Sequence, residues 1–223
     1  MASFIVTRRN GLYPRAAAAL AFAFCVAFSG AALGGEQCNY STYKWNVHTR
    51  KTVEPRRVSK PMSELTAEEK DSQTGCTVCE EDQVTMSFPG LPPFRVCRLL
   101  APRVEQIITE LQRNHAPLRD VVGYRVGMTR GNPDRAGNRT GFSNHSYGVA
   151  LDINTAQNGL YENCFHYNPA CRLSKGGAWN PNQETSLTGD SMIVREFKRN
   201  GFKWGGEIAG QQKDFMHFSP TGY

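Results

Sequence analysis

The most regular pattern of apolar positions in the chain lies between residues 102 and 114. Apolar side chains recur there at spacings of three and four, at Val104, Ile107, Ile108 and Leu111. This spacing places them on one face of a helix, and Pro102 suits the first helical turn. The pattern therefore predicts an amphipathic helix from about Pro102 to Asn114.

A second helix is predicted from Ser191 to Arg199. Asp190 or Ser191 offers a side-chain oxygen for capping its first turn. The dipeptide Asn200-Gly201 that follows is typical of a helix end.

Three short, mostly apolar runs predict strands, at residues 121–126, 149–153 and 215–218. Segment 131–140 is rich in Gly, Asn, Pro and Asp and predicts a loop, and segment 155–187 is also loop-rich. Helices and short strands in this order predict an α+β fold. We expect a small central, mostly antiparallel sheet with flanking helices.

The part of the chain that precedes the first helix is more polar. Prolines interrupt residues 36–96 at Pro55, Pro61, Pro89, Pro92 and Pro93. Because proline breaks regular structure, we expect an irregular N-terminal subregion that packs on the core. The predicted organisation is a signal peptide at 1–34, this subregion at 35–96 and a domain at 97–223.

The N-terminus has the pattern of a secretory signal peptide. Three arginines precede an apolar run that ends near Phe28, and Ala32 and Gly34 fit the small-residue positions of a cleavage site. The apolar run is short for a membrane span of about 20 residues. We therefore expect export to the periplasm or full secretion, with no stable membrane anchor after cleavage. An uncleaved anchor is the alternative.

The charge of the chain does not favour nucleic acid as a partner. The predicted signal carries three of the 26 basic residues and none of the 20 acidic ones, so its removal leaves a net charge of +3. No arginine stripe or basic helix accompanies this small excess. We expect no nucleic-acid partner and a monomeric protein.

Six of the seven cysteines follow the predicted signal, at Cys38, Cys76, Cys79, Cys97, Cys164 and Cys171. An even number of cysteines in an exported chain indicates disulfides. We expect the most local pair, Cys164–Cys171, to close a short loop. The sequence Cys76-Thr-Val-Cys79 is alternatively a redox or zinc pair.

Two histidines lie beside carboxylates. The segment from Ser143 to Asp152 reads Ser-Asn-His-Ser-Tyr-Gly-Val-Ala-Leu-Asp, and the bend at Gly148 can bring His145 and Asp152 to the same side. The apolar residues of the strand then face the core. A carboxylate in an apolar strand is costly unless it pairs or binds metal. A structural Asp–Arg or Asp–Ser contact is the alternative to a metal site.

The second histidine lies in the C-terminal run Asp-Phe-Met-His-Phe, which places Asp214 and His217 among aromatic residues. Zinc accepts imidazole and carboxylate ligands, and three protein ligands that leave room for water are typical of a catalytic site. His145, Asp152 and His217 are the candidate ligands. Asp214 then remains to accept and deliver a proton.

These two blocks resemble one known family. The residues from Ser143 to Asp152 fit the SxHxxGxAxD signature of VanY-like D-alanyl-D-alanine carboxypeptidases and L-alanyl-D-glutamate endopeptidases. The C-terminal block, Gly-Phe-Lys-Trp-Gly-Gly from Gly201 and Asp-Phe-Met-His-Phe from Asp214, resembles the same family. The resemblance covers about residues 100–223 and does not reach residues 36–96.

The resemblance implies a role for each candidate residue. The family's three zinc ligands correspond to His145, Asp152 and His217, and its general base and acid to Asp214. Arg125 resembles the family's upstream arginine, which binds substrate and stabilises the oxyanion, and Arg130 is a rival for that role. Ser219 stands where an acidic residue is common, and the Cys164–Cys171 region looks like an added loop. Both differences bear on substrate choice.

The sequence thus predicts a zinc peptidase domain at 97–223 that hydrolyses peptidoglycan stem peptides. The reaction is that of a D,D-carboxypeptidase or of an L-Ala-D-Glu-type endopeptidase. The alternative is a non-catalytic, zinc-containing module that binds the cell wall, but structural zinc sites usually have four protein ligands. A disulfide-rich secreted effector would account for the cysteines and for neither histidine block.

Overall fold

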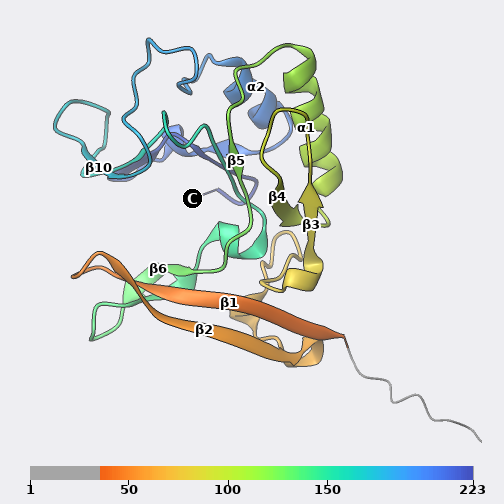
Figure 1. Cartoon of the computed structure of the whole chain (residues 1–223). Helices are drawn as coiled ribbons and strands as arrows, with labels where there is room; N and C mark the ends of the chain where they lie inside the picture. The colour runs from red at the N-terminus through yellow and green to blue at the C-terminus, as the bar shows by residue number, and fades with distance from the viewer. Residues whose placement is uncertain (1–35, 223) are drawn as a thin grey trace, which may run out of the picture. The chain divides into compact units, whose positions relative to one another are not determined.

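Residues 36–222 are described in the computed structural model of the chain, and the predicted signal peptide at 1–34 lies outside them. Within this part of the chain there are two α-helices, and short strands form four sheets (Figure 1). The strand pairs are antiparallel except for one, between β1 and β6. The predicted α+β class with mostly antiparallel sheets is confirmed.

Both predicted helices are present. Helix α1 (Ala101–Arg113) buries the four residues of the predicted apolar stripe and has proline in its first turn. Helix α2 (Met192–Arg199) is capped by Ser191, whose side chain accepts a hydrogen bond from the backbone N–H of Val194. The chain leaves α2 at Asn200 and turns at Gly201, where φ is +80°.

The central sheet has the strand order β11-β13-β8-β5. Its strands are β11 (Lys203–Trp204), β13 (His217–Ser219), β8 (Leu151–Ile153) and β5 (Val121–Val122). Leu151, Ile153 and Phe218 are fully buried and pack in one cluster with the apolar faces of α1 and α2. The three predicted strands therefore lie where the core is, although each is shorter than its apolar run.

The prediction that residues 36–96 are irregular is wrong. Strands β1 (Gln37–Asn46) and β2 (Lys51–Pro61) form a long antiparallel hairpin (Figure 1), and β3 (Gln83–Met86) pairs with β4 (Phe94–Cys97). β2 is an edge strand, and the pairing shifts register beside Pro55. Edge strands and bulges are the places where a strand tolerates proline.

The predicted loop at 131–140 is also wrong in part. Strands β6 (Met128–Pro133) and β7 (Arg139–Phe142) form a second hairpin, and only its turn is loop. The pairing shifts register twice, and Gly131 and Gly137 have φ of +76° and +84°. Glycine is here the residue that permits the bulge and the turn. This hairpin joins the first in a sheet of order β2-β1-β6-β7.

The loop-rich stretch 155–187 contributes to a third sheet. Its strands are β10 (Arg172–Lys175), β9 (Leu160–Glu162) and β12 (Gln212–Asp214), in that order. Short 3₁₀ turns occur elsewhere, at η1 (Met62–Glu64), η2 (Ala67–Glu69), η3 (Glu80–Asp82), η4 (Asn144–Tyr147) and η5 (Gly205–Glu207).

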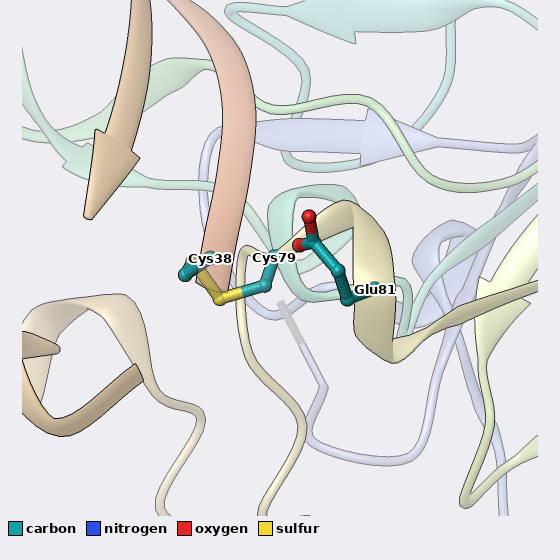
Figure 2. A group of neighbouring side chains, drawn as sticks. All are labelled: Cys38, Cys79 and Glu81. Atoms are coloured by element: carbon teal, nitrogen blue, oxygen red, sulfur yellow. A yellow bond between two sulfur atoms is a disulfide. The ribbon is translucent and has the colours of Figure 1, made fainter. Parts of the chain in front are cut away.

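The six cysteines outside the predicted signal form three disulfides, Cys38–Cys79, Cys76–Cys97 and Cys164–Cys171. The predicted local pair is confirmed, and the alternative of a redox or zinc pair at Cys76 and Cys79 is wrong. Figure 2 shows Cys38 of β1 and Cys79 joined through their sulfur atoms, with Glu81 beside them. Sulfur atoms bonded to each other are not thiolate ligands, so this group is a covalent cross-link and not a metal site.

Candidate metal centre

His145 is positioned by a short turn that reverses the chain before β8. Gly148 ends η4 with φ of +66°, and a Cβ at this position would lie 2.0 Å from Oε1 of Gln83. The Nδ1 atom of His145 lies 2.9 Å from the carbonyl oxygen of Gly123, and its carbonyl oxygen accepts a hydrogen bond from the N–H of Arg125. These contacts fix the ring with Nε2 toward Asp152.

Asp152 and His217 lie opposite each other on the paired strands β8 and β13. Oδ1 of Asp152 is 2.9 Å from Nε2 of His145 and 3.3 Å from Nδ1 of His217. All three side chains are buried, and their nearest ligand atoms lie within 4.8 Å of one another. The structure thus brings together the three residues that the sequence analysis selected.

The charge states of the cluster follow from burial and proximity. Burial lowers the pKa of His145 and of His217, which favours neutral imidazoles. Burial would raise the pKa of Asp152, but His145, the hydrogen bond from His217 and the charge of Arg125 hold that pKa well below its usual range. Two neutral imidazoles and one carboxylate are ligands in the protonation state that a metal requires.

The donor set fits a zinc ion. Zinc accepts imidazole nitrogen and carboxylate oxygen, and ligand atoms roughly 2.1 Å from the metal stand about 3.4 Å apart in a tetrahedron. The separations of 2.9 and 3.3 Å around Asp152 are near this value. The Gly123 carbonyl that meets the second ring nitrogen of His145 is the kind of outer contact that orients metal-binding histidines.

Two cations also reach Asp152. Nη2 of Arg125 lies 2.7 Å from Oδ2, and Nζ of Lys175 lies 4.0 Å from the same atom. The alternative of a structural Asp–Arg contact is therefore present, but together with both histidines. Lys175 was not selected from the sequence, because it lies in a stretch that showed no motif.

The cluster lies in a cleft of about 670 Å³. Arg125, Arg130 and Asp214 line the same cleft, and Asp214 is buried at the end of β12. Arg125 donates a hydrogen bond to Asp152. All the side chains proposed from the sequence thus meet around one cavity.

Residues 136–220 match the D-alanyl-D-alanine carboxypeptidase family. The predicted resemblance is confirmed over this range. We call residues 136–220 the carboxypeptidase segment, after the family that they match. The segment contains His145, Asp152, Asp214 and His217. Arg125 and the β1–β2 hairpin precede it. No curated protein and no solved structure matches the chain.

Residues outside the carboxypeptidase segment also line the cleft. Tyr43, Trp45 and Thr52 of the β1–β2 hairpin line it as well. Sequence reasoning missed them because residues 36–96 carry no motif of the family. The alternation of Cys38 and Tyr40 with the polar Asn39 and Ser41 was the sequence signal that could have found the strand, and β1 does bury Cys38 and Tyr40.

Trp204 belongs to the core of the carboxypeptidase segment. Its side chain is 7% exposed, and its Nε1 donates a hydrogen bond of 2.7 Å to the carbonyl oxygen of Phe215. This bond fixes the backbone of Phe215, the residue that follows Asp214. Trp204 therefore helps to position Asp214 and does not line the cleft itself.

Proposed function

We propose that the protein is a zinc-dependent peptidase that hydrolyses stem peptides of bacterial peptidoglycan. The observation that carries the proposal is the buried cluster of His145, Asp152 and His217 in a cleft of the carboxypeptidase segment. His145, Asp152 and His217 would hold the metal. When bound, zinc supplies Lewis-acid chemistry, which polarises a peptide carbonyl and lowers the pKa of water.

Asp214 is the proposed proton carrier. It lines the cleft three positions before His217, and its charge acts on that histidine. A carboxylate in this place accepts a proton from the attacking water and delivers it to the nitrogen of the departing amine.

Arg125 is the proposed hydrogen-bond donor to the carbonyl oxygen of the substrate. A guanidinium has five N–H donors, and the hydrogen bond to Asp152 uses one nitrogen. The other donors can reach a substrate oxygen, where a fixed positive charge stabilises the negative charge that develops during attack.

Incubation of the purified, oxidised protein with muropeptides tests the proposal. Mass spectrometry of the products shows whether a peptide bond is cut, and the masses tell carboxypeptidase from endopeptidase action. Chelation should abolish the activity and zinc should restore it. A protein that binds zinc and releases no product would instead be a wall-binding module.

The variant Asp214→Asn separates the metal from the proton carrier. We expect it to keep stoichiometric zinc and to lose about 100-fold in kcat, because general acid–base catalysis contributes about that factor or more. The matched control is Asp190→Asn, which removes an exposed carboxylate outside the cleft. Near-normal turnover by Asp214→Asn would remove Asp214 from the mechanism.

We further propose that the protein is exported. Its three disulfides are typical of oxidising compartments, and a wall peptidase meets its substrate outside the cytoplasm. Within residues 36–222, no helix has the length and apolar character needed to cross a bilayer. N-terminal sequencing of the mature protein from the producing cell tests the predicted cleavage near Gly34.

A further inference from the structure

The wall of the cleft formed by the first two hairpins lies largely outside the segment that matches the family. Tyr43, Trp45 and Thr52 come from β1 and β2, and Arg130 and Arg139 from β6 and β7. We call these five residues the hairpin wall. Arg139 alone of the five lies inside residues 136–220. The two aromatic residues of the hairpin wall are therefore not part of the family match.

The hairpin wall is fixed to the metal centre by close packing. A Cβ at Gly127 would lie 2.6 Å from Cζ of Tyr43, so the tyrosine ring packs directly on the backbone that follows Arg125. β1 also pairs with β6 at Lys44 and Met128. The start of β1 is held by the Cys38–Cys79 disulfide (Figure 2). Asn39 adds two hydrogen bonds to the carboxylate of Glu81.

The hairpin wall is aromatic and cationic. No acidic residue of these four strands lines the cleft. Arg139 donates to the carbonyl oxygen of Gly131, and among the described residues it has no ion pair with a carboxylate. A guanidinium in a partly enclosed cleft matches a carboxylate of a ligand, because its donors form a planar fork.

The third sheet also contributes charged side chains to the cleft. Lys175 of β10 adds a cation, and Glu162 of β9 is paired with Arg172. The turn of the first hairpin touches this third sheet, where Nη2 of Arg50 lies 3.4 Å from Oγ of Ser174. Both sheets therefore place cationic side chains along the cleft, beside a peptide that extends from the metal centre.

We propose that the hairpin wall selects extended stem peptides that carry a free carboxylate away from the bond that is cut. The two aromatic rings cover the peptide and Arg139 binds the carboxylate. This inference rests on the proposed function, and it names the substrate feature that the same cleft recognises. A short, neutral acyl-dipeptide would reach the metal centre without engaging the hairpin wall.

The first test uses the unaltered protein, so folding of a variant is not at issue. The probes are a synthetic stem pentapeptide with a free glutamate α-carboxylate and the same peptide with that group amidated. We expect kcat/KM to be about tenfold higher for the free acid, since a charge-assisted hydrogen bond contributes about that factor. Equal values for the two peptides would overturn the proposal.

The second test assigns the effect to the hairpin wall. In Arg139→Gln the ratio of kcat/KM for free acid over amide should fall to about one. The matched control is Arg56→Gln, which removes the same charge from β2 outside the cleft and should keep the tenfold ratio. An unchanged ratio in Arg139→Gln, with an unchanged far-UV spectrum, would contradict the assignment.

A binding measurement keeps this inference distinct from the proposed function. Calorimetric titration of the Asp214→Asn variant with the two pentapeptides needs no turnover. Tighter binding of the free acid, lost on adding Arg139→Gln, supports the hairpin wall even if no bond is ever cut. Equal binding of both peptides overturns it even if hydrolysis is observed.

Discussion

At the scale of single residues, one carboxylate organises the site. Asp152 is buried against two imidazoles and one guanidinium, and its pKa is held well below the usual range despite its burial. An isolated buried charge would be costly, but each of these partners favours the charged form. The same carboxylate is thus held in the charged form that a metal ligand needs.

The two imidazoles make the stability of the metal-free protein depend on pH. Burial lowers the pKa of His145 and His217, so below about pH 6.5 the unfolded chain binds protons that the folded chain does not. The free energy of unfolding should therefore decrease as the pH falls below this value. The limit is about 1.4 kcal/mol per pH unit for each histidine.

Urea unfolding of chelated protein between pH 7 and pH 5 measures this dependence. His217→Gln should have a shallower slope because one titrating group is removed. His166→Gln is the control, since His166 is exposed and outside the cleft. Equal slopes in all three proteins would show that the buried histidines do not cause the effect.

Gly148 is the backbone position on which the cluster depends. Gly148→Ala combines a φ of +66° with a Cβ 2.0 Å from Oε1 of Gln83 and 2.6 Å from the N of Cys97. Gly90→Ala has the same kind of φ, +74°, but open space. We expect Gly90→Ala to lose about 1 kcal/mol of stability, and Gly148→Ala to lose clearly more together with zinc affinity. Similar losses in the two variants would contradict the close contact.

At the scale of elements, the sequence predicted the helices and strands that form the core. The stripe of α1 has a clear periodicity because the other face of this helix is polar, and the strand around Leu151 and Ile153 stands out as a short apolar run. The cluster of His145, Asp152 and His217 was predictable because two short motifs carry it. That prediction needed no knowledge of how the N-terminal part folds.

The two hairpins escaped prediction for physical reasons. β2 has mostly exposed side chains and a proline at a bulge, so it shows neither alternation nor an apolar run. The β6–β7 hairpin is rich in residues that usually indicate loops, because its bulges and turn need glycine. β1 pairs with β2 in the first hairpin and with β6 of the second. Strands that are stabilised by such pairing show little pattern in their own sequence.

The cap of α2 provides a test at this scale. Ser191 Oγ accepts from the N–H of Val194, and its loss leaves that donor without a side-chain acceptor. Ser191→Ala should cost about 1 kcal/mol in urea unfolding and leave kcat unchanged, because no residue of α2 lines the cleft. Ser191→Asp restores an acceptor and should recover most of the loss. If Ser191→Ala unfolds like the parent protein, the cap is not formed in solution.

At the scale of the molecule, the cleft is a composite of separate parts of the chain. Residues of the N-terminal hairpin, of the β6–β7 hairpin and of the carboxypeptidase segment all line it. Residues 36–222 belong to one compact unit, and the disulfides Cys38–Cys79 and Cys76–Cys97 tie its N-terminal part together. Loss of either disulfide should therefore change the N-terminal side of the cleft and leave the candidate metal ligands in place.

Removal of single disulfides should separate stability from selectivity. The Cys38–Cys79 pair closes 41 residues and the Cys164–Cys171 pair closes 7, so the chain-entropy model gives about 4 and about 2 kcal/mol of stabilisation. We expect Cys38→Ser/Cys79→Ser to lose more stability, and also the preference for acidic peptides. Cys164→Ser/Cys171→Ser should keep more of both. Urea unfolding and the kcat/KM ratio check this, and the reverse order would contradict it.

The Cys38–Cys79 disulfide has a consequence for when the cleft takes its final form. Where the two cysteines are reduced, nothing covalent holds the start of β1 in place. The strands that carry Asp152 and His217 pair with each other without help from this bond. The redox state of the surroundings should therefore alter which peptides fit the cleft and leave the cluster of His145, Asp152 and His217 intact.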